Sequence, residues 1–140
     1  MTESVHGKPP HRTVEPASLA APAGYAHGVL AKPGRTLYLA GQVGWDAKGV
    51  FARGLVAQVD RALQNLCAVV KEAGGTPEHL VSMRVYVLSG VAWRASSKEI
   101  GAAWRERIGR WFPAMSLVVV AGLYEPEALV EIEGVAVIPD

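Results

Sequence analysis

Residues 115–138 read MSLVVVAGLYEPEALVEIEGVAVI, two apolar runs joined by a segment of turn-forming residues. The first run, 115–121, is nearly all apolar, which is typical of a strand buried on both faces and predicts a central strand. The second run, 129–138, is interrupted only by Glu131 and Glu133 before its end. We therefore expect two closing strands, with Glu131 as a carboxylate in an otherwise apolar setting.

Upstream of these strands, the chain alternates strand and helix patterns. Two apolar runs, 28–31 and 36–43, flank a Pro-Gly pair, which predicts an opening hairpin. Apolar residues recur every three and four positions over 55–73, as in an amphipathic helix. Residues 81–89 alternate apolar and polar side chains like a strand with one polar face, and 96–109 carries a second helical stripe. The expected order is ββαβαββ.

This order predicts an α+β domain in which two helices cover one face of a mixed sheet. The other face has no helix to cover it, so a symmetric oligomer is expected to bury it. Residues 1–22 are rich in Pro, Ala, His and charge without an apolar period, which predicts an N-terminal arm, mobile or laid over the surface. Residues 23–140 are expected to form the single domain.

Composition narrows the range of partners. The net charge is +1 and the basic residues are scattered among acids, so neither nucleic acid nor a membrane is an expected partner. Cys67 is the only cysteine, which excludes an internal disulfide and favours a cytoplasmic location. The four histidines have no spacing that would place two of them on one helix face, so no metal site is expected.

Six short motifs occur in one order between Gly24 and Ile138. They are Gly24-Tyr25, LAGQV at 39–43, Gln58 with Asn65-Leu66, Ala73-Gly74-Gly75, FPAMS at 112–116 and LVEIEGVA at 129–136. In this combination the chain resembles the Rid family, the reactive-intermediate deaminases also called YjgF-like proteins or endoribonuclease L-PSP. The resemblance implies a chorismate-mutase-like fold and a homotrimer whose sheets face a central barrel. It also implies small-molecule clefts at the subunit boundaries and no cofactor.

In well-known family members, a cleft arginine binds the substrate carboxylate, and a glutamate holds the water that hydrolyses an imine to a ketone and ammonia. By this resemblance, four of the family's cleft residues are retained in this chain: Tyr25, Gly41, Gln42 and Glu131. At four other positions the family's serine, asparagine, arginine and cysteine are replaced here by Ala40, Gly101, Met115 and Leu117.

Met115 changes the expected ligand. An arginine fork binds a carboxylate through paired charge-assisted hydrogen bonds, whereas a thioether supplies neither the charge nor the donors. We therefore expect little or no activity on 2-iminobutyrate and related imino acids. The apolar side chains of Ala40, Met115 and Leu117 instead favour a cleft for a neutral or more hydrophobic ligand.

Glu131 is the candidate catalytic residue. Burial in an apolar strand raises the pKa of a carboxyl group and suits it to act as a general acid or base on water. The structural alternative is an ion pair with Arg84 or another cation on a neighbouring strand. Glu133 points to the same side because strand residues alternate, and a salt bridge is the favoured role for it.

Three further candidates for ligand binding each have a structural alternative. Tyr25 can close over a ligand or pack at a strand entry. Gly41 can leave its N–H open to a ligand or mark a β-bulge. Trp93, in the loop expected before the second helix, can line the cleft, while the other tryptophans fill the core or an interface.

Two functions remain open at the level of sequence. The first is a cofactor-independent hydrolase or deaminase of altered specificity that uses Glu131 to position water. The second is a non-catalytic trimer that binds an apolar metabolite in the same clefts. The first predicts turnover that is lost in Glu131→Ala, and the second predicts thermal stabilisation by a ligand without turnover.

Overall fold

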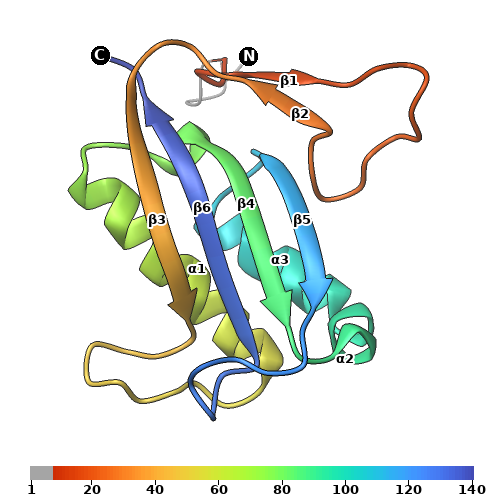
Figure 1. Cartoon of the computed structure of the whole chain (residues 1–140), viewed down its shortest axis with the longest axis vertical. Helices are drawn as coiled ribbons and strands as arrows, with labels where there is room; N and C mark the ends of the chain where they lie inside the picture. Colours follow the sequence, from red (N-terminus) through yellow and green to blue (C-terminus); the bar gives the residue numbers. More distant parts are fainter. Residues whose placement is uncertain (1–7) are drawn as a thin grey trace, which may run out of the picture.

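The computed structural model describes residues 8–140, which form a four-stranded mixed sheet with helices on one face and a two-stranded ribbon beside it (Figure 1). The elements in chain order are β1 (Arg12–Val14), β2 (Gly28–Leu30), β3 (Arg35–Val43), α1 (Leu55–Glu72), the 3-10 helix η1 (Pro77–His79), β4 (Leu80–Val87), α2 (Gly90–Ala95), α3 (Ser97–Arg107), β5 (Ala114–Val119) and β6 (Val130–Ile138). The predicted α+β fold and mixed sheet are confirmed, with β1 and α2 as additions.

The strand order in the main sheet is β3-β6-β4-β5. Strands β4 and β5 are parallel, whereas β6 is antiparallel to both of its neighbours. Helices α1 and α3 lie behind the sheet in Figure 1 and leave its front face without a covering helix. We call this front surface, with Arg84, Tyr86, Val118, Glu131 and Glu133, the bare face; these residues share one side because they pair directly across the strands.

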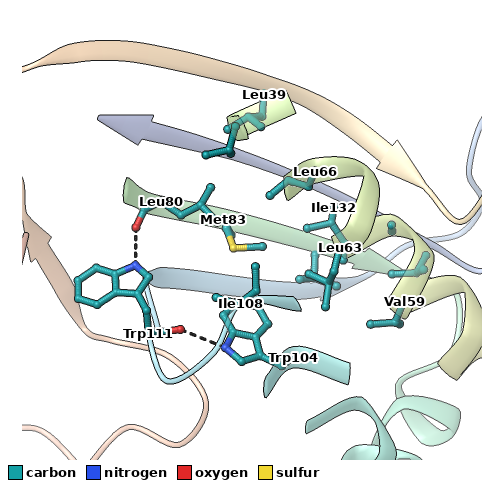
Figure 2. Close-up of a cluster of buried hydrophobic side chains, with 14 of the residues drawn as sticks. Leu39, Val59, Leu63, Leu66, Leu80, Met83, Trp104, Ile108, Trp111 and Ile132 are labelled. Carbon is teal, nitrogen blue, oxygen red and sulfur yellow. Dashed lines mark hydrogen bonds between the residues drawn. The ribbon is translucent and has the colours of Figure 1, made fainter. Parts of the chain in front are cut away.

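The core lies between the helices and the sheet and is closed at one end by two tryptophans (Figure 2). The indole N–H of Trp104 donates to the carbonyl of Trp111 at 3.0 Å, and that of Trp111 donates to the carbonyl of Leu80 at 2.7 Å. Each indole therefore buries its ring while its one polar group stays satisfied, which is the usual condition for a buried tryptophan. The two bonds join the end of α3 to the start of β4.

The predicted opening hairpin between residues 28–31 and 36–43 is wrong. Strand β2 pairs with β1, and β3 pairs with β6 along most of its length. The nine-residue β3 can bury Leu37 and Leu39 over the core only next to β6, whereas the three-residue β2 offers it a short partner. Turn-forming residues between two apolar runs do not by themselves specify that the two strands pair with each other.

The N-terminal arm is partly built into the fold. The buried ring of His11 bonds through Nε2 to the carbonyl of Val137 at 2.7 Å and accepts the N–H of Lys32 at Nδ1, at 3.0 Å. These bonds hold β1 beside the end of β6, as in a segment laid over the surface. The first seven residues of the arm lie outside the described residues.

The prediction of a central strand at residues 115–121 is also wrong. Strand β5 lies at the edge of the sheet, and β6 returns between β3 and β4 to take the central place. Val119, at the end of β5, is 59% exposed. An apolar run indicates that both faces of a strand need burial. Either the chain's own sheet or a second chain can supply that burial.

Gln58 is a buried polar residue, only 3% exposed, that ties three segments together. Its Nε2 donates to the carbonyls of Ala52 and Glu127 at 3.2 and 3.0 Å, and its Oε1 accepts the N–H of Leu129 at 2.8 Å. Gln58→Ala leaves these backbone groups without partners. We expect it to lower the free energy of unfolding by about 2–3 kcal/mol, measured by urea denaturation.

Gln64→Ala is the matched control, because Gln64 is on the same helix and only accepts a 3.3 Å bond from Arg61. Its cost should stay within about 0.5 kcal/mol, as for most substitutions away from buried networks. Equal destabilisation by the two variants would contradict the role assigned to Gln58.

Candidate functional site

A cavity of about 440 Å³ lies between the helix-covered side of the sheet, α2 and α3, and the loop before β2. The sheet contributes Val85 from β4, Met115 and Leu117 from β5 and Ile132 from β6. The remaining walls come from Ala23, Gly24, Tyr25, Val59, Leu63, Trp93, Ser97, Ile100, Gly101, Trp104 and Phe112. The volume is within the range of small-molecule sites, roughly 300–1,000 Å³.

Four of the predicted ligand-binding residues meet in this cavity: Tyr25, Trp93, Met115 and Leu117. Met115 and Leu117 both face it because they are two residues apart on β5. Trp93 does not lie in a loop, as expected, but in α2. This helix begins after Ser89, whose hydroxyl oxygen accepts the N–H of Ala92 at 3.0 Å, so a local cap adds a helix that the apolar pattern did not reveal.

Tyr25 forms the outer wall of the cavity from the loop between β1 and β2. Its ring packs edge-on against that of His27, with centroids 5.5 Å apart. His27 is itself held by a 2.6 Å bond between Nε2 and the carbonyl of Ala20. Ala26, between Tyr25 and His27, forms a β-bridge with Ala114 at the start of β5. This bridge anchors the loop beside the cavity.

Glu131 does not face this cavity. Its neighbour Ile132 lines the cavity, and side chains alternate along a strand, so Glu131 points to the bare face. On the bare face it lies directly across from Tyr86 of β4 in the strand pairing. Within one chain the candidate catalytic carboxylate and the apolar cavity are therefore on opposite sides of the sheet.

Gly41 lies against Glu131. A methyl group at Gly41 would come within 2.7 Å of the carboxyl carbon of Glu131, closer than any real contact, so a side chain here would displace the carboxylate. The pairing register between β3 and β6 shifts between Leu39 and Gln42. Gly41 therefore lies at a β-bulge and is also closely approached by the side chain of Glu131. The preceding residue, Ala40, is exposed.

The charges on the bare face are arranged around Glu133. The hydroxyl of Tyr86 donates to the Glu133 carboxylate at 2.5 Å, and Nη1 of Arg84 lies 3.9 Å from the same oxygen. This hydrogen bond, followed by burial and the negative charge of Glu133, raises the pKa of Tyr86 above its usual value. The predicted salt bridge of Glu133 is confirmed.

Arg84 therefore pairs with Glu133 and does not pair with Glu131. Among residues 8–140, the Glu131 carboxylate has no hydrogen-bond or ion-pair partner, which leaves its oxygens available to water or to a ligand. Arg84 is on the opposite side of the sheet from Met115 because its partner on β5 is Ser116. It does not replace the missing arginine inside the same cavity.

Several residues of the cavity were not singled out from sequence. Ile100 and Trp104 belong to the helical stripe, which indicated only a core. Phe112 precedes β5 and stacks on Trp104, with ring centroids 5.6 Å apart and planes 5° apart. No local signal separates a residue that fills a core from one that lines a cavity beside it, since both are apolar.

Within residues 8–140, no three His, Cys, Asp or Glu side chains gather closely enough to hold a metal ion. None of the helices in the same range is long and apolar enough to cross a membrane.

The class of protein follows from solved structures of the same fold. A protein of unknown function from Yersinia pestis, YyfB of the Rid family, is 34% identical, with a TM-score of 0.81 and coverage of 92% of this chain and 99% of that one. RidA from the Antarctic bacterium Psychrobacter is 27% identical, with a TM-score of 0.64 and coverage of 85% and 92%. The fold is that of the Rid proteins.

A family model described as endoribonuclease L-PSP matches residues 15–138. The chain belongs to this family, the Rid or YjgF family, as the motifs between Gly24 and Ile138 indicated. No curated protein sequence matches it.

Proposed function

We propose that this chain forms a homotrimer whose small-molecule clefts each join the apolar cavity of one protomer to Gly41 and Glu131 of its neighbour. In this cleft the protein hydrolyses uncharged imines without a cofactor. The observation that carries the proposal is the position of Glu131 on the side of the sheet opposite the cavity. One protomer alone cannot bring both groups to one ligand, whereas two can.

The exposed apolar surface supports the assembly. Val118 on the bare face and Val119 at the end of the edge strand β5 would be buried against another subunit, and β5 has a free edge over most of its length. Light scattering should give about three times the 14.9 kDa of the chain. A monomer at micromolar concentration would contradict the proposal.

The single cysteine agrees with the proposed cytoplasmic location.

The proposed chemistry needs one carboxylate and one water. Glu131 accepts a proton from the water as its oxygen adds to the imine carbon, and the carboxylic acid returns this proton to the imine nitrogen, which gives a neutral carbinolamine. Glu131 then takes the proton of the new hydroxyl group and delivers it to the nitrogen as the C–N bond breaks, so that a carbonyl compound and ammonia leave and the carboxylate is restored. Glu131 is suited to this role because it has no competing partner among the described residues.

The substrate proposed is an imine without a carboxylate, such as one formed by oxidation of an amine. All fifteen residues that line the cavity are uncharged. A carboxylate would lose its hydration there and gain no cation, and this cost excludes an amino-acid-derived imine.

Substrate preference provides the test. Wild-type protein should accelerate ammonia release from an imine generated by an amine oxidase, and it should not accelerate release from an imino acid generated by an amino-acid oxidase. Met115→Arg should raise activity on the imino acid by roughly 10- to 100-fold, because the guanidinium supplies a charge-assisted bond to the carboxylate. Both rates are measured by a coupled ammonia assay.

Met115→Gln is the matched control, since it has similar length but no charge. It should not gain activity on the imino acid. Wild-type turnover of imino acids that equals turnover of the amine-derived imine would disprove the proposed preference.

A non-catalytic metabolite-binding trimer is the second candidate. The uncharged lining favours it, since such a cavity binds an apolar molecule without any chemistry. This function predicts that a neutral ligand raises the melting temperature while no imine is hydrolysed. Turnover that depends on Glu131 would exclude it.

A further inference from the structure

Aromatic side chains are concentrated around the cavity. The chain has ten Phe, Trp and Tyr residues, and four of them, Tyr25, Trp93, Trp104 and Phe112, are among the fifteen that line it. Trp104 and Phe112 lie parallel, with planes 5° apart. The thioether of Met115 adds a polarizable group of the kind that packs well on aromatic rings. A flat aromatic molecule would find stacking and edge contacts here.

Gly101 is a glycine in the middle of α3 that faces this cavity. Its φ is not in the left-handed region, so the backbone does not require glycine. A Cβ at this position would meet only the end of the Arg105 side chain, at 3.6 Å, so close packing does not require it either. Glycine nevertheless weakens a helix relative to alanine. The remaining consequence of the missing side chain is room in the cavity.

The polar groups at the cavity are few and neutral. Among the lining residues, Tyr25, Trp93 and Ser97 each carry one polar side-chain group, while the indole N–H of Trp104 already donates to Trp111. No charged side chain is among the fifteen lining residues. The site therefore matches a ligand with a large apolar surface, at most one or two hydrogen-bonding groups, and no net charge.

We infer that the cavity binds an uncharged, planar aromatic small molecule, and that Gly101 is the specificity-determining residue whose missing side chain makes room for the ring. The inference rests on the cleft of the proposed function and names the class of its ligand. It extends to binding alone and does not require turnover.

Indole is the probe, because it is planar, uncharged and carries one hydrogen-bond donor. Isothermal titration of the full chain should show indole binding, with indole-3-acetate weaker by at least about tenfold because its carboxylate would lose hydration among uncharged lining residues. Cyclohexanol, which is uncharged but not planar, should also bind at least about tenfold more weakly. Equal affinity for all three compounds would overturn the inference, as would the absence of indole binding.

Gly101→Leu places a side chain in the proposed ring position. Binding of indole should weaken by at least about tenfold, whereas the melting temperature should rise by ~2–4 °C because leucine favours a helix more than glycine does. Ala102→Leu adds the same side chain at the next, exposed position of α3 and should leave binding unchanged. Gly101→Ala, a smaller change, should weaken binding less.

Unchanged indole binding in Gly101→Leu would overturn the inference. Glu131→Gln distinguishes this failure from failure of the proposed function, because it should slow turnover by about 100-fold or more while indole binding persists. Gly101-dependent indole binding in a protein that hydrolyses no imine would support the inference and reject the hydrolase.

Discussion

Glu131→Gln is expected to slow hydrolysis of an amine-derived imine by about 100- to 10,000-fold, the range typical for loss of a general base. Glutamine has the same shape and can still bond to water, but it cannot take a proton from it. Because Glu131 has no partner among residues 8–140, the substitution should leave the melting temperature unchanged. The measurement is the initial rate of ammonia release at a protein concentration that limits the rate.

Glu133→Gln is the matched control on the same strand and the same face. This carboxylate is already held by Tyr86 and Arg84, so it has no role in the proposed chemistry. The control should keep its catalytic rate and lower the pKa of Tyr86, which loses a charged hydrogen-bond acceptor. A Glu131→Gln variant that retained full activity would assign the carboxylate a structural role.

Trp111→Ala is the substitution expected to destabilise the fold most among those proposed. The side chain is buried in the core, and its indole N–H donates to the Leu80 carbonyl at 2.7 Å. Removing a buried tryptophan ring costs about 3–5 kcal/mol, and loss of the hydrogen bond adds about 1 kcal/mol. Urea denaturation should therefore show loss of about 4–6 kcal/mol, a large share of the stability of a typical domain.

Trp111→Phe separates the two contributions, since it keeps an aromatic ring and removes the indole donor. Its cost should be less than half that of Trp111→Ala. Similar losses in both variants would mean that the hydrogen bond to Leu80, and not packing of the ring, dominates.

Local patterns in the sequence predicted most elements correctly. The apolar stripe of α1 and the alternation in β4 specify these elements because each period records one buried side of a regular backbone. The pairing of strands was harder to predict. Strand β6 inserts between β3 and β4, and no residue near β5 records that β5 is left at the edge. Registry and strand order arise from contacts between segments distant in sequence.

The candidate site divides in the same way. Tyr25, Met115 and Leu117 were identified from their motifs and do meet in one cavity. From sequence, Gly101 was identified only as a position where the family's asparagine is replaced. The structure places it at the cavity, where its missing side chain leaves space beside the aromatic residues. Trp104 and Phe112 could not be distinguished from ordinary core residues because apolar character alone does not say whether a ring meets a neighbour or an empty volume.

By itself, the sequence determined the family, the order of most elements and the replacement of an arginine by Met115, since these depend on residue identity and local period. Only the tertiary structure decided that Glu131 and Met115 face opposite sides of the sheet. Which side a strand residue faces in space depends on where α1 and α3 pack, and that packing is a property of the assembled core. Residues 115–138 therefore supply both Met115 and Glu131, but in the proposed trimer Met115 lies in the cleft of its own protomer and Glu131 in the cleft of an adjacent one.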